Sequence, residues 1–367
     1  MPRANKESSS DPAGESNIRT LKRGLKMVSF SSLLGNEALK THLQKALSDQ
    51  HISHAYLLEG PEGSGKKTAA AAFVRALFCL HPVTGPDGRY DSCGQCENCR
   101  LLDHDAFPDL ALIEPEDGAK SLSAQIIRQR LVSDATVLPY KGSRKVYVVD
   151  RADLMTPEAQ NALLKTIEEP PQGVTILLLC QSASLLLPTV LSRCVRLSTA
   201  PLPPSVIENV LVKKGADPSR AASLAALSQG SLGKALALFE DDNFSALREN
   251  WFHFLSSIPT MPQIEVLQKG GELFDTYASF QDQLLSLSLI WFSDLLKWKT
   301  AGDRALLVSK DYCPQIQKAS SFYTDSSLIA ITETIRRIGA CLARNANKGL
   351  AQDLLLISFT GKDQIYW

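Results

Sequence analysis

The sequence is notable first for three features that it does not have. No apolar run reaches about 18 residues, so no segment is expected to span a membrane. The 39 Lys and Arg balance the 39 Asp and Glu, which disfavours a uniformly basic body that grips nucleic acid by charge alone, although local basic patches could still exist. Residues 1–26 lack the apolar centre of a secretory signal and are expected to be a disordered extension, or to precede a start at Met27. We therefore expect a cytoplasmic protein.

A length of 367 residues favours two or three domains. In the first half, apolar runs of strand length alternate with segments of helical periodicity. The expected strands are residues 55–58, 110–113, 146–149 and 174–180, and the expected helices include residues 37–47, 68–79 and one that begins at Pro157 after the cap Thr156. Such alternation predicts an α/β domain with a largely parallel sheet.

The second half is expected to be entirely helical. A Pro-rich joint at residues 200–204 separates the two halves, and every periodic segment beyond it has the helical repeat. Residues 205–240 contain about three short helices, and longer helices follow from about residue 245.

Residues 60–66 match the phosphate-binding pattern G-x-x-x-x-G-K between an expected strand and an expected helix. Gly60, Gly63 and Gly65 would let backbone N–H groups surround phosphate oxygens, and Lys66 would reach the terminal phosphates. The next position should be the Ser or Thr that ligates Mg²⁺, but it is Lys67. A site descended from a nucleotide site is therefore expected, and present-day binding of ATP or ADP is left open.

Asp150 ends an apolar strand and stands where a metal-holding carboxylate is expected. An active ATPase of this type needs a Glu at the following position to orient the attacking water, and that position is Arg151. Hydrolysis by this chain should be slow even if ATP binds. Taken alone, Asp150 would be better interpreted as a solvated residue at the end of a strand, and it is the phosphate loop upstream that favours the metal-holding role.

Four of the eight cysteines cluster in residues 79–99. Cys93, Cys96 and Cys99 have the spacing C-x-x-C-x-x-C, and Cys79 precedes them. Tight turns of this kind can direct four thiolates to one tetrahedral Zn²⁺, and a closed set of four sulfurs is structural. The alternatives are an iron–sulfur cluster, which also takes four thiolates, or reduced free thiols.

Several segments together resemble the AAA+ clamp-loader family of bacterial DNA polymerase III. They are residues 54–61, 161–171, 191–194, 230–236 and 345–350, the last followed by Leu354, Leu355 and Leu356. Residues 191–194 read Leu-Ser-Arg-Cys, and the resemblance implies that Arg193 acts as an arginine finger on ATP held by a neighbouring subunit. A lone loop Arg would otherwise be taken as a solvated charge. Lys234 stands where an Arg is common in the family, so no role is carried over to it.

The departures at residues 67 and 151, with the cysteine cluster retained, are similar to the delta-prime branch of this family. The resemblance implies a RecA-like AAA+ domain over residues 27–199 with a zinc-binding insertion, a small helical lid over 200–243 and an all-helical collar over 244–367. It also implies a hetero-pentamer with gamma/tau and delta subunits that places a sliding clamp on primer-template DNA at the replisome, within the DNA-directed DNA polymerase holoenzyme.

Two other interpretations are weighed against this one. A gamma/tau-type ATPase motor would have to bind Mg²⁺ without the hydroxyl at position 67 and hydrolyse ATP without a Glu at position 151. A free-standing zinc-containing DNA-binding scaffold would bind DNA strongly and with steep salt dependence, which the balanced charge argues against.

Overall fold

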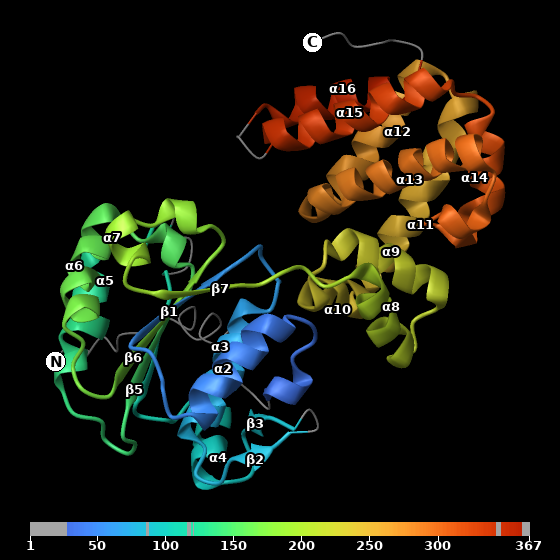
Figure 1. The fold of residues 1–367 in the computed structure, drawn as a ribbon. Coiled ribbons are helices and arrows are strands. Elements are labelled where there is room, and N and C mark those ends of the chain that lie inside the picture. Colours follow the sequence, from blue (N-terminus) through green and yellow to red (C-terminus); the bar gives the residue numbers. More distant parts are fainter. Residues whose placement is uncertain (1–27, 86–87, 116–118, 120, 343–345, 362–367) are drawn as a thin grey trace, which may run out of the picture. The chain divides into compact units, whose positions relative to one another are not determined.

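The computed structural model describes residues 28–85, 88–115, 119, 121–342 and 346–361. The chain divides into two compact units, Met1–Pro201 and Leu202–Trp367 (Figure 1). The expected extension at residues 1–26 lies outside the described part of the chain, and so does residue 345 of the last family segment.

The first unit is built on a five-stranded parallel sheet in the order β4-β5-β6-β1-β7. The strands are β1 (Ala55–Glu59), β4 (Leu110–Ile113), β5 (Lys145–Val149), β6 (Val174–Cys180) and β7 (Val195–Ser198). The side chains of β5 and β6 are buried along their whole length. Parallel strands covered on both faces are apolar at successive positions, which is why these segments do not alternate polar and apolar residues.

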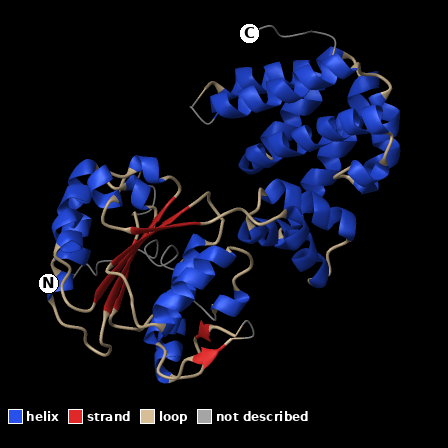
Figure 2. Cartoon of the chain, in the orientation of Figure 1, coloured by secondary structure: helices blue, strands red, loops and turns tan. Residues whose placement is uncertain are grey.

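Helices cover both faces of the sheet (Figure 2). One face packs against α2 (Glu37–Ser48) and α3 (Lys66–Phe78), through a cluster that includes Leu43, Leu58 and Phe73. The other face packs against α5 (Ala124–Ile127), a π-helical turn η3 (Arg128–Val132), α6 (Pro157–Glu168) and α7 (Pro188–Leu191). This arrangement confirms the predicted α/β domain with its parallel sheet.

A small insertion follows α3. It consists of an antiparallel pair of two-residue strands, β2 (Val83–Thr84) and β3 (Tyr90–Asp91), and of α4 (Glu97–Asp103). The carboxylate of Asp91 is buried and accepts hydrogen bonds from the N–H groups of Phe30 and Ser31, both at 3.1 Å. The insertion is thereby fixed to the 3-10 turn η2 (Phe30–Ser32), which precedes α2.

Among its described residues, the second unit has helices and connecting loops but no strand. Its α-helices are α8 (Pro204–Lys213), α9 (Pro218–Ser228), α10 (Leu232–Glu240), α11 (Asp242–Ser257), α12 (Gln263–Thr276), α13 (Gln281–Ala301), α14 (Cys313–Ser320), α15 (Asp325–Leu342) and α16 (Lys348–Phe359). The three short helices and the longer ones that follow confirm the predicted change at the Pro-rich joint. Among the described residues, no helix is both long and apolar enough to cross a membrane.

Arg248 on α11 connects the short helices to the long ones. Its guanidinium donates to both carboxylate oxygens of Asp311, at 2.7 and 2.9 Å, and to the hydroxyl of Ser223 on α9 at 3.0 Å. It also stacks on the rings of Phe252 and Tyr312. The short and long helices therefore form one compact unit, within which a separate lid over 200–243 and collar over 244–367 stay predictions.

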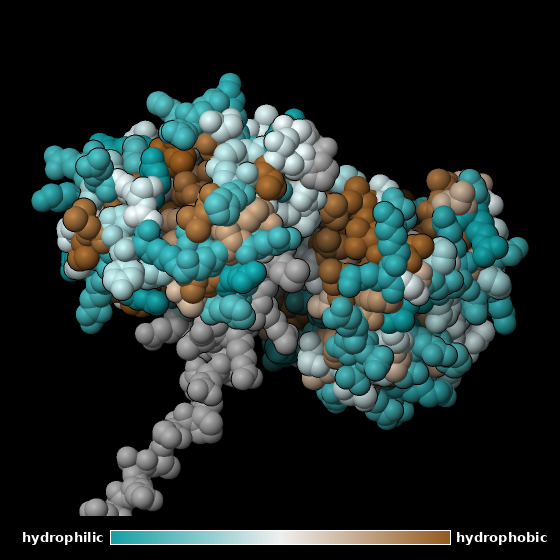
Figure 3. All heavy atoms as spheres, turned by 90° about the horizontal axis from the view of Figure 1, so that it is seen from below, coloured by the Kyte–Doolittle hydropathy of each residue, from teal (hydrophilic) through white to brown (hydrophobic). Residues whose placement is uncertain are grey.

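Apolar side chains also reach the surface of each unit (Figure 3). In the first unit, Leu138 and Tyr140 are 80% and 87% exposed. The loop that presents them is held by the buried carboxylate of Asp109, which accepts the N–H groups of Tyr140, Lys141 and Gly142. In the second unit, the exposed large apolar side chains include Phe322, Ile329 and Leu350.

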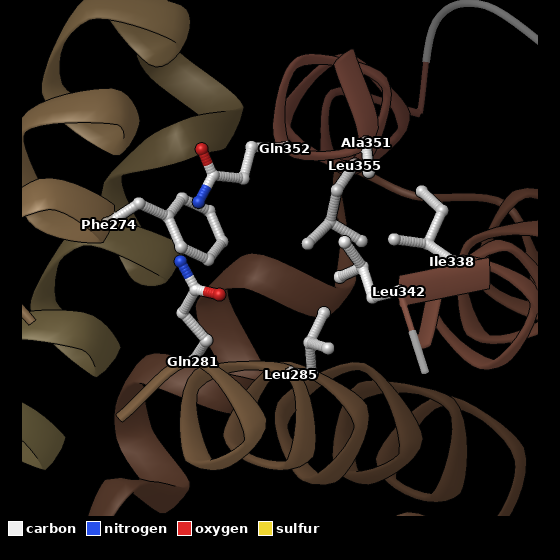
Figure 4. Close-up of a pocket in the computed structure, with 8 residues that line it drawn as sticks. All are labelled: Phe274, Gln281, Leu285, Ile338, Leu342, Ala351, Gln352 and Leu355. Carbon is white, nitrogen blue, oxygen red and sulfur yellow. The ribbon is translucent and has the colours of Figure 1, made fainter. Parts of the chain in front are cut away.

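A small apolar pocket lies between α12, α13, α15 and α16 (Figure 4). Phe274, Leu285, Ile338 and Leu355 line it, with the amides of Gln281 and Gln352 at its margin. It is a gap in the packing of the long helices.

Candidate functional sites

The phosphate loop lies where the sequence predicts it, between the end of β1 at Glu59 and the start of α3 at Lys66. Gly60 has φ = 154°, and a Cβ there would come within 2.2 Å of the Thr199 hydroxyl oxygen. Only glycine fits at this point, because the turn passes directly against the chain that leaves β7.

Lys66 binds the loop itself. Its Nζ donates to the carbonyl oxygens of Gly60 at 2.6 Å and of Pro61 at 2.8 Å. Burial lowers the pKa of Lys66, an effect opposed by the nearby Cys180 and by the carboxylates of Asp150, Asp153 and Glu62. The ammonium expected to reach phosphates is thus engaged by backbone acceptors of the loop.

Lys67 forms an ion pair with the strand carboxylate. Its Nζ lies 2.7 Å from Oδ2 of Asp150, whose side chain is 7% exposed, against 47% for Lys67. The ammonium therefore neutralises the carboxylate that would hold Mg²⁺ in an active ATPase. Arg151, at the position of the missing Glu, is exposed and has a left-handed backbone with φ = 51°.

Thr199 and Asn36, which the sequence analysis missed, hold the phosphate loop in place. The hydroxyl oxygens of Ser64 and Thr199 lie 2.6 Å apart. Asn36 donates from Nδ2 to the Ser64 carbonyl at 2.9 Å and accepts the Ala200 N–H on Oδ1 at 2.8 Å. Neither Thr199 nor Asn36 belongs to a phosphate-binding pattern. Thr199 reaches the loop because β7 pairs with β1.

The structure brings together all four predicted cysteines, and their sulfur atoms lie within 4.8 Å of one another. Cys79 is the C-cap of α3 and Cys96 is the N-cap of α4, and their sulfur atoms are 4.0 Å apart. Four sulfurs about 2.3 Å from a central zinc ion would be about 3.8 Å apart in a tetrahedron. The spacing therefore fits a four-coordinate metal ion, and the cluster could bind one.

Backbone N–H groups support negative charge on these sulfurs. Cys93 Sγ accepts the N–H groups of Cys96 at 3.3 Å and Gln95 at 3.4 Å, and Cys79 Sγ accepts that of Cys93 at 3.3 Å. Burial opposes ionisation of Cys96, but the N–H groups of Cys99 and Leu80 and the neighbouring thiols outweigh it and lower the pKa of Cys96 to about 6. Such N–H groups favour the thiolate form that metals require, whereas burial raises the pKa of Cys99 and of Cys79.

Arg193 lies two residues beyond α7, with 37% of its side chain exposed. Nη2 is 2.9 Å from Oε1 of Glu168 at the end of α6, and Nη1 donates to the Thr189 carbonyl at 2.9 Å and the Ser192 hydroxyl at 3.2 Å. The pairing with Glu168 was not predicted. Lys234 is exposed near the start of α10, in the second unit.

The parallel sheet, with a glycine-rich loop between its β1 strand and α3, defines the first unit as a P-loop nucleotide-binding fold whose loop has lost its Mg²⁺ hydroxyl. Residues 35–203 match the family model described as DNA polymerase III, delta subunit. The chain is 29% identical to the DNA polymerase III subunit delta' of Bacillus subtilis, across 86% of this chain and 93% of that protein. It is 33% identical to the Escherichia coli subunit delta' across 66% and 68%. The tau/gamma subunit of Haemophilus influenzae is also 33% identical, but across 60% of this chain and only 32% of that protein.

The chain belongs to the delta-prime family of DNA polymerase III clamp-loader subunits. This confirms the resemblance, the expected fold class and the expected role in DNA replication. Delta-prime is favoured over gamma/tau because the Bacillus delta' relative is matched over nearly its full length.

Proposed function

We propose that this chain is the stationary subunit of a clamp loader, which holds no working nucleotide of its own and supplies Arg193 to ATP bound by an adjacent gamma/tau subunit. Its partners would be gamma/tau and delta subunits in a hetero-pentamer that places a sliding clamp on primer-template DNA in the cytoplasm. The polymerase activity belongs to the holoenzyme.

One observation carries the proposal: the chain's own cations occupy its nucleotide site. Lys66 is bound to loop carbonyls, and Lys67 is paired with Asp150. ATP–Mg²⁺ would have to displace both ammonium groups, and it would find no Glu at position 151 to orient water. Arg193, by contrast, is partly exposed at the surface, where a second subunit could bring its ATP.

We assign a structural zinc ion to Cys79, Cys93, Cys96 and Cys99. Zinc suits four thiolates, and a closed set of four leaves no position for a reacting ligand. The ion would order an insertion that has short strands and little apolar core of its own. Within the described residues of the insertion, Asp91 would transmit that order to the start of the AAA+ domain through η2.

The second unit would supply the lid and the collar. Exposed apolar side chains such as Phe322, Ile329 and Leu350 support contacts of this unit with partner subunits, because burial of such side chains is what stabilises a permanent assembly.

The test compares ATP turnover by the reconstituted loader, with clamp and primed DNA, for wild type and Arg193→Ala. An arginine finger is worth about 10³-fold or more at the affected site, and the total would fall less because other gamma/tau sites keep working. Arg196→Ala is a matched control, since Arg196 is an exposed arginine with its own carboxylate partner, Glu59, at 3.1 Å. Turnover that is unchanged in Arg193→Ala with assembly intact would contradict the proposal, and so would hydrolysis by the chain without partners.

A further inference from the structure

Glu168 and Arg193 come from different helices that share one core. Ile167, directly before Glu168, and Val190 in α7 belong to the same buried cluster, and Leu191 and Cys194 pack against it. The positions from which the two charged side chains leave the backbone are therefore fixed by burial on both sides. Two prolines at positions 170 and 171 follow the end of α6 and prevent the helix from continuing.

The guanidinium of Arg193 is held at both terminal nitrogens. The Thr189 carbonyl and the Ser192 hydroxyl accept from Nη1, and Oε1 of Glu168 forms an ion pair with Nη2 at 2.9 Å. The two hydrogen bonds account for two of the five N–H donors of an arginine, both on Nη1. Among the described residues no hydrogen-bond acceptor is found for the donors on Nε and Nη2, so they can bind oxygen atoms of a ligand.

The ion pair between Glu168 and Arg193 orients the guanidinium but can be broken when a ligand binds. Both side chains are partly exposed, Glu168 at 45% and Arg193 at 37%, and ion pairs in such positions are worth little net free energy because solvent screens them. A long, rotamer-rich side chain nevertheless loses less freedom on binding a phosphate if it is already held near the right conformation.

We propose that Glu168 is a positioning residue for Arg193: its carboxylate holds the guanidinium in a ready conformation until the neighbouring subunit presents its triphosphate. The proposal rests on the function proposed above for Arg193. The incoming phosphate oxygens would take up the free donors and compete with Glu168 for Nη2.

The experiment measures ATP turnover of the reconstituted loader with the variant Glu168→Ala. We expect kcat per affected site to fall by about 3–10-fold, with KM for ATP unchanged, because the residue organises the transition-state contact and does not bind ATP. Glu168→Gln keeps the shape of the side chain but removes the charge of the ion pair, so its turnover should lie between those of wild type and Glu168→Ala.

Glu169→Ala is the matched control, because Glu169 is an adjacent exposed carboxylate with no contact to Arg193 among the described residues. A double variant, Arg193→Ala with Glu168→Ala, should turn over no more slowly than Arg193→Ala alone. A further loss in the double variant would point to a merely structural role and overturn the proposal.

The outcomes separate the two proposals. If Arg193→Ala lowers turnover but Glu168→Ala behaves like Glu169→Ala, the positioning role fails and the finger stands. Faster turnover in Glu168→Ala would also overturn it, because Glu168 would then restrain Arg193. If Arg193→Ala itself has no effect, the finger fails and the role of Glu168 fails with it.

Discussion

The nucleotide loop and the cysteine cluster lie at opposite ends of the same helix, α3. The loop contains positive side chains of the chain itself, whereas the cluster consists of thiols that could bind a metal cation. At the start of α3, Lys66 donates to carbonyl oxygens of the loop, and Lys67 is paired with Asp150, the carboxylate expected to hold Mg²⁺. At its end, Cys79 joins three other thiols whose sulfurs converge within 4.8 Å of one another.

The difference separates a site where the chain supplies its own cation from one that is open to a metal ion. A carboxylate as buried as Asp150 needs a counter-charge, and Lys67 in α3 supplies it. Four converged thiols are served better by a metal ion than by any side chain, because one ion satisfies all of them. In the function proposed above, the first site is independent of ligand and the second would depend on a bound metal ion.

The largest expected effect is at the cysteine cluster. Removal of zinc with a chelator, or the substitution Cys96→Ser, should lower the free energy of unfolding of the first unit by at least about 3 kcal/mol. For a unit of this size that corresponds to a fall in melting temperature of about 6–12 °C. The measurements are metal content per chain and thermal unfolding.

The matched control for this prediction is Cys341→Ser, because Cys341 is an exposed free cysteine in the second unit. It should keep one zinc ion per chain and the wild-type melting temperature. A purified protein without bound metal that melts at the same temperature before and after treatment with chelator would contradict the assignment.

A smaller effect is expected at the nucleotide loop. Lys67→Thr restores the hydroxyl of an active phosphate loop and frees Asp150, so it should tighten Mg²⁺-dependent ATP binding by about 10-fold, or about 1.4 kcal/mol. Hydrolysis should stay absent because Arg151 is unchanged. Calorimetric titration with and without Mg²⁺ measures the change.

Lys67→Ala is the control that frees Asp150 without supplying the hydroxyl. It should bind ATP more weakly than Lys67→Thr and should destabilise the fold, because Asp150 then lacks its counter-charge. Equal ATP binding by wild type and both variants would mean that Lys67 does not close the site.

The smallest effect concerns Glu59, at the base of the loop. The Ala183 N–H lowers the pKa of Glu59 below 4.5, burial opposes this, and Arg196 adds to the lowering. A carboxylate with a lowered pKa stabilises the fold above its unfolded value, and the contribution is lost as pH falls through the folded value. Glu59→Gln should therefore cost less than about 1 kcal/mol at neutral pH.

The measurement for Glu59 is denaturant unfolding of wild type and Glu59→Gln between pH 7 and pH 3. The difference in stability should shrink once the pH falls below 4.5. A difference that stays constant over this range would mean that the charge of Glu59 contributes nothing.

Much of the fold could be predicted because its signals are local. Residues 174–180 are apolar at nearly every position and became the fully buried β6, and Thr156 caps α6 through a hydrogen bond to the Ala159 N–H, as expected. The gathering of the four cysteines was also predictable, since C-x-x-C spacing needs only a tight turn. Helix α3 begins two residues before the predicted helix 68–79 and ends one residue before it, because it starts directly after the left-handed Gly65.

The contacts that join distant segments were not predictable. Thr199 follows the last strand of the sheet and reaches Ser64 only because β7 pairs with β1. Glu168 reaches Arg193 only because α6 and α7 share a core. Neither contact can be inferred from the spacing of residues within one segment.

The sequence by itself determined the α/β and helical halves, the loop with its missing hydroxyl, and the gathering of the four thiols. These features depend on periodicity, on backbone freedom at glycine and on side-chain chemistry, which are all properties of residues close together in the sequence. Only the tertiary structure decided what became of the altered residues. Each of the two cations is ordered only if the fold brings a carboxylate within about 3 Å of it. The fold brings Asp150 to Lys67 and Glu168 to Arg193.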